Sequence, residues 1–344
     1  MELGITTFAD TIPDPVTGTI ISHGDRLRQV IEEVELADQV GLDVYGIGEH
    51  HRPDFAASAP AIVLAAAAAR TERIRLTPAV SVLSSDDPVR VFQQYATLDL
   101  ISSGRAELLV GRGSFIESFP LFGYSLNDYE DLFIEKLGLL LEIRNSERVT
   151  WSGRFRPPLQ DQAIYPRPQQ DPFPIWVGVG GNPMSMVRAG RLGLPVALAI
   201  IGGDPVRFRA LAEIHRRSLV EAGHDPAAAP LAVHAHGYIA DTDRQAADEF
   251  FPSYAAAMTK LGAERGWPPM TRLQFDQMRA PTGSLVLGDP ETVAAKILAW
   301  QGFLGIERFM LHMSVGTLPH KQVLRTIELL GTEVAPIIRD TDGT

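Results

Sequence analysis

Cysteine is absent from the 344 residues of this chain, which excludes disulfide bonds, thiolate metal sites and a cysteine nucleophile. Long apolar runs are also missing, because no stretch approaches the roughly 18–20 residues that a membrane-spanning helix needs. The first six residues lack the basic and apolar regions of a secretory signal. We therefore expect no membrane partner and a cytoplasmic location.

Basic residues are in the minority, with 31 Lys and Arg against 42 Asp and Glu and a formal net charge of −11. Such a charge disfavours nucleic acid and anionic membrane surfaces as main partners. A phosphate-bearing ligand must be held by a local site against the overall field. We expect a small-molecule substrate and no nucleic acid.

Strand-like and helix-like segments alternate along the chain. Helices are predicted after each strand, and several begin at an Asp-Pro or Asn-Pro pair. The polar side chain there can cap free amides, and proline fits the first helical position. The pattern predicts an α/β fold whose parallel sheet closes into a (β/α)8 TIM barrel, with an open doubly wound sheet as the competing architecture. The predicted strands are 3–7, 44–48, 74–83, 106–111, 175–179, 195–201, 231–240 and 308–312.

Two segments are longer than this repeat needs, about 146–174 and about 245–283. Long insertions on a barrel often cover the active site, although peripheral decoration explains them equally well. No linker or low-complexity segment separates parts of the chain. We therefore expect residues 1–344 to form a single barrel domain with two insertions.

The sequence Glu49-His50-His51 follows directly after the apolar strand 44–48. In parallel α/β proteins, catalytic side chains gather at the carboxyl ends of the strands. A histidine beside a carboxylate can be held in one tautomer and act as a proton donor or acceptor near neutral pH. These residues are the first candidates for catalysis.

A second candidate is an anion site built from two segments. Arg112 stands between Gly111 and Gly113 after the strand 106–111, where a guanidinium can bind phosphate or form an ordinary salt bridge. A glycine-rich turn with Gly180, Gly181 and Asn182 leads from the next strand into a helix that contains Ser185. Free amides at such a helix start bind anions, although tight packing explains the glycines as often.

Histidines at other strand ends allow a different reading. His234 and His236 lie on one face of the seventh strand, and His312 ends the eighth. Together with His50 and His51 they could form a metal cluster of a hydrolase. A single strand histidine is more often a hydrogen-bonded structural residue, and the small residues 77–82 are by themselves most simply explained as core packing.

Taken together, these residues resemble the bacterial luciferase-like monooxygenase family, flavin-dependent oxidoreductases on a (β/α)8 barrel. The resemblance covers nearly the whole chain and depends on the order and spacing of short motifs. The matching segments are 41–51 with the Glu-His-His signature, 87–90, 98–105, 110–113, 174–183, 286–293 and 329–336.

The resemblance implies that the cofactor is FMN, with the flavin ring against Ala79, Val80 and Ser81. A non-proline cis peptide is expected there, at Ala79–Val80. The phosphate is expected at the residues of the anion site, namely Arg112, Gly180, Gly181, Asn182 and Ser185.

His50 matches the position of the family's catalytic base, and Glu49 matches an orienting residue near the flavin. The resemblance also implies oxygen as co-substrate, a small organic substrate, a separate flavin reductase and a homodimer. Luciferases proper have a cysteine where this chain has Gly111, so light emission is not expected.

The substrate-facing loops 8–25 and 114–127 vary within the family and give no specificity. Their phenylalanines either wall an apolar substrate or pack the rim. Three alternatives remain at this stage: a dehydrogenase that uses a reduced deazaflavin, a flavin-binding protein without turnover, and the metal-dependent hydrolase. The phenylalanines concerned are Phe8, Phe115, Phe119 and Phe122.

Overall fold

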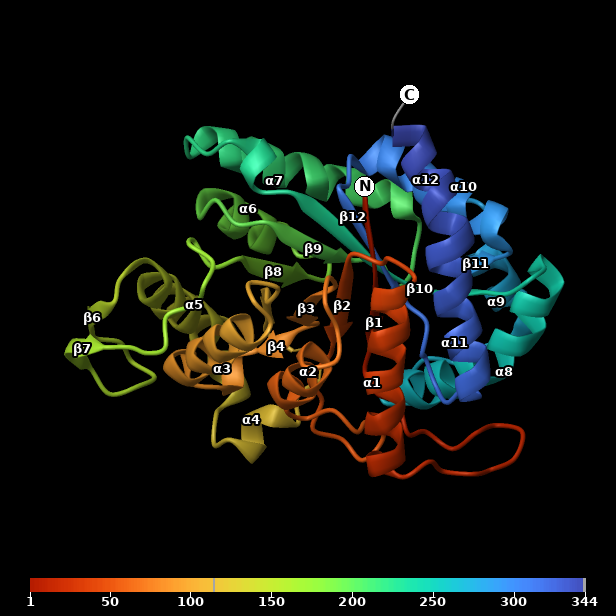
Figure 1. Cartoon of the computed structure of the whole chain (residues 1–344), viewed down its shortest axis with the longest axis horizontal. Coiled ribbons are helices and arrows are strands. Elements are labelled where there is room, and N and C mark those ends of the chain that lie inside the picture. The colour runs from red at the N-terminus through yellow and green to blue at the C-terminus, as the bar shows by residue number, and fades with distance from the viewer. Residues whose placement is uncertain (114, 343–344) are drawn as a thin grey trace.

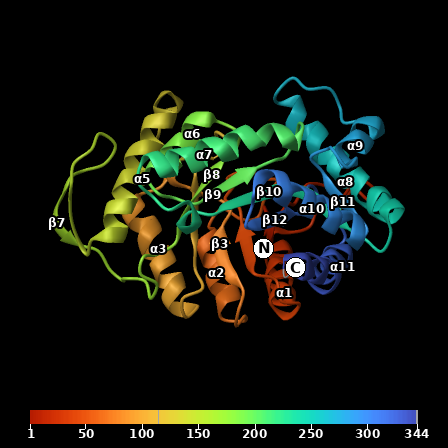
Figure 2. The ribbon, with the colours of Figure 1, turned by 90° about the horizontal axis from the view of Figure 1, so that it is seen from above.

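The computed structural model describes residues 1–113 and 115–342, so position 114 and the last two residues of the predicted domain lie outside it. A parallel sheet forms a barrel at the centre, and helices surround it (Figures 1 and 2). The predicted TIM barrel is confirmed. Its strands are β1 (Glu2–Thr7), β2 (Val44–Ile47), β3 (Arg75–Pro78), β4 (Ser81–Val82), β5 (Leu108–Gly111), β8 (Ile175–Val179), β9 (Val196–Ala199), β10 (Leu231–Ile239) and β12 (Arg308–His312).

The order around the barrel is β3-β2-β1-β12-β10-β9-β8-β5-β4, with parallel pairing throughout. The predicted strand 74–83 is interrupted at residues 79 and 80, so that β3 pairs with β2 while β4 pairs with β5. A parallel bridge from Leu76 to Ala106 links the two ends of the sheet. This closure rules out the open doubly wound sheet. The short strand β11 (Val286–Gly288), which the pattern did not predict, adds to β10.

The surrounding helices follow the expected alternation. They are α1 (His23–Gln39), α2 (Pro60–Ala68), α3 (Pro88–Ile101), α4 (Ser118–Leu121), α5 (Tyr129–Asn145), α6 (Pro183–Arg191), α7 (Arg209–Glu221), α8 (Asp243–Ala263), α9 (Arg272–Arg279), α10 (Pro290–Leu304), α11 (His320–Leu329) and α12 (Ala335–Asp342). None of the helices in the described ranges is long and apolar enough to cross a membrane.

The Asp-Pro and Asn-Pro pairs begin helices as predicted. The side chains of Asp87, Asn182 and Asp289 each accept a backbone N–H from the first turn of the helix that follows. Asp204 caps a short 3-10 helix (Pro205–Phe208) that continues into α7, rather than an α-helix directly. These local caps fix where each helix leaves the barrel, and thus which loops meet at its open end.

The two predicted insertions lie on different sides of the barrel. The first contains an antiparallel ribbon of β6 (Arg148–Trp151) and β7 (Leu159–Ala163), which projects beside α5 at the left of Figure 1. The second contains nearly all of α8 and the whole of α9, which pack near β11 on the opposite side. The second insertion approaches the catalytic strand ends, as described below.

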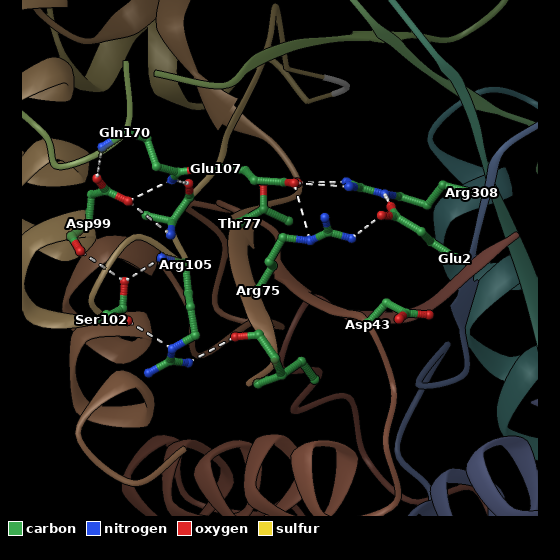
Figure 3. Close-up of polar contacts among 12 residues, drawn as sticks. Glu2, Asp43, Arg75, Thr77, Asp99, Ser102, Arg105, Glu107, Gln170 and Arg308 are labelled. Atoms are coloured by element: carbon green, nitrogen blue, oxygen red, sulfur yellow. Dashed lines mark hydrogen bonds and ion pairs between the residues drawn. The ribbon is translucent and has the colours of Figure 1, made fainter. Parts of the chain in front are cut away.

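Paired charges lie at the amino-terminal end of the barrel (Figure 3), where they border a cavity of about 860 Å³. Arg308 is 4% exposed and donates to Glu107 at 2.6 and 2.9 Å and to Glu2 at 2.7 Å. Arg75 forms ion pairs with Glu2 and Glu107. The Arg308 guanidinium also lies 4.3 Å from the centre of the Trp176 ring. Because these charges are paired with one another, we interpret this end as structural and the opposite end as the site of chemistry.

The family-like motif 98–105 is also structural in this fold. Asp99 is fully buried and accepts backbone N–H groups of Gln169 and Gln170 at 2.8 and 3.0 Å. Figure 3 shows Asp99 next to Gln170. Arg105 donates to the carbonyl oxygens of Ala68, Thr71 and Ile74 at 2.8–3.0 Å. The motif therefore ties α3 to the first insertion and to the loop before β3.

Candidate active site

The Glu-His-His sequence lies where β2 ends, at the carboxyl end of the barrel. Glu49 Oε2 accepts the backbone N–H of Val82 at 2.9 Å, and Glu49 Oε1 lies 2.9 Å from His51 Nε2. The carboxylate therefore orients His51 and not His50. Glu49 also connects β2 to the segment after the Ala79–Val80 bond, since its backbone N–H donates to the Val80 carbonyl at 3.3 Å.

His50 is 7% exposed and lies in an aromatic enclosure. The ring centres of Phe8, Phe55 and Phe115 are 4.4, 4.5 and 5.0 Å from its own. Burial, with smaller contributions from His51 and Arg52, lowers the pKa of His50 to about 3. His50 Nε2 is buried and has no hydrogen-bond partner among the described residues. His50 is thus a neutral imidazole with a nitrogen available to a ligand.

The peptide bond between Ala79 and Val80 is cis, as the resemblance implied. The Val80 side chain projects over two glycines, because a Cβ built on Gly111 or Gly178 would lie 2.6 or 2.8 Å from Val80 methyl carbons. Val80, Gly178 and Ala199 are partly exposed, whereas most of their strand neighbours are buried. These small residues provide an accessible floor at the open end of the barrel.

Two residues that were not predicted, Glu130 and Arg188, connect Arg112 to the helix that follows the glycine turn. Arg112 makes a short ion pair with Glu130 of α5, and its guanidinium lies 5.3 Å from the centre of the Tyr129 ring. Arg188 of α6 lies 3.4 Å from the second oxygen of Glu130. Arg188 Nη1 is buried and finds no partner within the described ranges. Glu130 therefore holds the guanidinium groups of Arg112 and Arg188 together. Neither Glu130 nor Arg188 was predicted from the sequence as a site residue.

The glycine turn directly precedes α6, about two helical turns before Arg188. A Cβ on Gly180 or Gly181 would meet no described atom within 4 Å, and Gly181 has a φ of +112°. Asn182 caps the helix by accepting the N–H of Met184 at 2.9 Å, and Ser185 is buried in the first turn. The amides of Met184 and Ser185 are already bonded within this turn, so it offers a phosphate group open space beside the positive end of the helix dipole.

Three histidines and a threonine form a row inside the barrel mouth. Thr6 Oγ1 lies 2.8 Å from His234 Nε2 and 3.0 Å from His312 Nδ1. His236 is buried at a ring-centre distance of 5.4 Å from His312, and its Nδ1 has no hydrogen-bond partner in the described part of the chain. Burial lowers the pKa of all three histidines, to about 4 for His234 and about 3 for His236. We call His234, His236 and His312 the interior histidines.

The interior histidines do not form the metal cluster that the spacing allowed. No group of three or more His, Asp or Glu side chains within residues 1–113 and 115–342 is arranged to hold a metal ion. Phe8 separates the row from His50, with ring-centre distances of 4.2 Å to His312 and 4.4 Å to His50. The metal-dependent hydrolase therefore gains no support from this geometry.

Arg52 connects its own loop after β2 to the segment before α4 and to the end of α8. It donates to Glu117 at 2.8 Å and to Glu264, and it lies 3.8 Å from Asp54. Its guanidinium is 4.7 Å from the Phe115 ring centre, on a ring that also contacts His50. The pocket beside His50 measures only about 10 Å³, which is about enough for one water molecule. The second insertion, through Glu264, thus helps to cover the site.

The chain belongs to the luciferase-like monooxygenase family, whose pattern matches residues 1–306. It is similar to the monooxygenase RslO1 from Streptomyces bottropensis, with 25% identity, a TM-score of 0.85, and coverage of 98% of this chain and 99% of that one. It shares its fold with the oxygenating constituent of 3,6-diketocamphane monooxygenase from Pseudomonas putida, solved in complex with FMN, at 21% identity and a TM-score of 0.77 over 98% of both chains.

A relative with a different activity matches part of the chain. The F420-dependent glucose-6-phosphate dehydrogenase of Amycolatopsis mediterranei is 30% identical over 179 residues, which cover 48% of this chain and 51% of that protein. The chain therefore matches about half the length of that relative. The chain thus belongs to a family of monooxygenases and related oxidoreductases, and its relatives differ in their cofactor.

Proposed function

We propose that this protein is an FMN-dependent monooxygenase that uses reduced FMN and oxygen to oxidise a small organic substrate. The observation that supports this most is His50, a neutral and unpartnered imidazole at a strand end beside an accessible floor of small residues. Family membership supplies the reaction class, and the anion site supplies a place for the phosphate of the cofactor.

The residues fit FMN at both ends of the molecule. Arg112 and Arg188 offer two guanidinium groups, one with a buried unpartnered nitrogen, beside the open turn at Gly180 and Gly181. The floor around Val80 offers a surface without bulky side chains for a flat ring. Bound in this way, reduced flavin would supply the electrons that activate oxygen.

The protein's own residues would control protons and water. His50 is neutral at physiological pH, so it can accept a proton at Nε2 from a substrate or give one back later. Phe8, Phe55 and Phe115 keep water away from that nitrogen. Glu49 holds His51 and the segment after Val80 in place, which we propose is its role in the site.

Anaerobic titration with reduced FMN, followed by admission of oxygen, tests this proposal. Binding together with a transient absorbance distinct from reduced and oxidised FMN is expected. Binding without any reaction with oxygen would favour a flavin-binding protein without turnover. Failure to bind FMN in either redox state would refute the assignment of the cofactor.

A deazaflavin-dependent dehydrogenase is the second candidate, because a relative at 30% identity is named for F420. Competition between FMN and F420 for the same protein separates the two. A protein that binds F420 and ignores FMN would use hydride transfer and have no need of oxygen. A cytoplasmic homodimer served by a separate flavin reductase remains our prediction in the monooxygenase case.

A further inference from the structure

Thr6 occupies an unusual place among the interior histidines. Its hydroxyl lies within hydrogen-bond distance of two ring nitrogens, from residues 228 and 306 positions away in the chain. Thr6 is fully buried at the end of β1, between β2 and β12. Its hydroxyl therefore bridges two imidazole rings that are distant in the sequence and that the barrel brings together. We call this bridge the Thr6 link.

The hydrogen bonds of Thr6 restrict which ring nitrogens of His234 and His312 can carry a proton. A hydroxyl has one hydrogen to donate and two lone pairs to accept with. Burial keeps His234 and His312 neutral, so each ring has one N–H and one bare nitrogen. If Thr6 donates to one ring, the other ring must donate to Thr6. The two rings then have opposite protonation at the nitrogens that face Thr6.

The two imidazole rings also differ in solvent exposure. His234 is partly exposed and borders the floor at Ala199, whose strand β9 pairs with β10. His312 is 1% exposed and lies against Phe8, which in turn contacts His50. The Thr6 link therefore connects a partly exposed imidazole to an enclosed one, which Phe8 separates from the proposed base.

We infer that His234, Thr6 and His312 form a proton relay from the barrel mouth to the interior of the active site, a role that rests on the proposed function. A proton from solvent binds His234 at Nδ1, and His234 releases its Nε2 proton to Thr6 Oγ1. Thr6 passes its own hydrogen to His312 Nδ1, and His312 releases its Nε2 proton to an acceptor in the site. The reverse transfer restores the starting tautomers, so no proton is created or lost.

The tautomers can be measured in the ligand-free protein by long-range ¹H–¹⁵N NMR of labelled histidine, with signals assigned through H234Q and H312Q. One of the two nitrogens that face Thr6 is expected to carry hydrogen, and the other to be bare. Hydrogen on both nitrogens would make Thr6 a double acceptor and overturn the relay. This measurement needs no flavin, so its result is independent of whether FMN proves to be the cofactor.

Kinetics distinguish a relay from a structural hydrogen bond. In T6V we expect reoxidation of bound reduced FMN by oxygen to slow roughly 10- to 100-fold, within the range of lost acid–base catalysis, and its solvent isotope effect to change. T6S keeps the hydroxyl and should restore both. T7V is the matched control, because Thr7 also lies on β1 but bonds Ser314 instead, at 2.7 Å. An unchanged isotope effect in folded T6V, or equal effects in T6V and T7V, would contradict the relay.

Discussion

Glu130 is expected to compete with the cofactor phosphate for the two arginines of the anion site. Its oxygens contact Arg112 and Arg188, and its side chain is 45% exposed. A phosphate that binds both guanidinium groups must displace this carboxylate or share them with it. Replacing Glu130 by Gln removes the competing charge while keeping the shape of the side chain.

The size of the effect follows from the exposure of Glu130. Half-exposed ion pairs contribute about 0.2–1 kcal/mol each, because solvent screens them. Releasing both should strengthen FMN binding by about 0.4–2 kcal/mol, which is roughly a 2- to 30-fold lower Kd. By contrast, R112A should weaken binding by about 1.5–3 kcal/mol, because a charged hydrogen bond is lost.

Fluorescence titration with FMN and with riboflavin measures this effect. Riboflavin lacks the phosphate, so its affinity should not respond to E130Q or R112A. E142Q is the control for net charge, since Glu142 is an exposed carboxylate on the same helix. Weaker FMN binding in E130Q would refute the competition and would mean that Glu130 positions the arginines for the phosphate. An equal change for riboflavin would remove the phosphate from this site.

Three further predictions concern the base, the barrel end and pH. H50A should keep FMN affinity within about twofold but lose at least roughly 100-fold in turnover, in line with the loss of general acid–base catalysis; normal turnover would remove His50 from that role. R308A leaves Glu107 buried without its main partner and should cost about 3–5 kcal/mol in urea unfolding, whereas R75A, at a side chain that is 32% exposed, should cost no more than about 1 kcal/mol. Equal losses would mean that burial does not set the strength of this network. Stability should fall as pH drops below 6.5, because His50 and the interior histidines have lowered pKa values and bind protons more readily when unfolded, at about 1.4 kcal/mol per pH unit for each such group. Asp10 acts in the opposite sense, since burial raises its pKa to about 7, so D10N should steepen the loss between pH 6.5 and 5; a flat unfolding profile of the unaltered protein would contradict the histidine shifts, and an unchanged slope in D10N would contradict the shift of Asp10.

The architecture was predictable from the sequence because it depends on local signals. Apolar runs gave the strands, Asp-Pro and Asn-Pro pairs gave helix starts, and their alternation gave the barrel. The position of Glu49-His50-His51 at a strand end followed from the same pattern. The break between β3 and β4 was not predicted, since the pattern gave one strand over 74–83, and only the cis bond at Ala79–Val80 was expected through the family resemblance. β11 was missed because three residues carry too little pattern to indicate a strand.

The partners of the site residues were decided by the tertiary structure. Sequence could not tell that Glu49 holds His51, that Glu130 joins Arg112 to α6, or that Thr6 lies between two histidines. These contacts depend on the register and curvature of strands that are distant in the chain, and neighbouring residues do not encode them. The sequence by itself therefore determined which chemical groups reach the open end of the barrel, whereas closure of the barrel determined which of them touch.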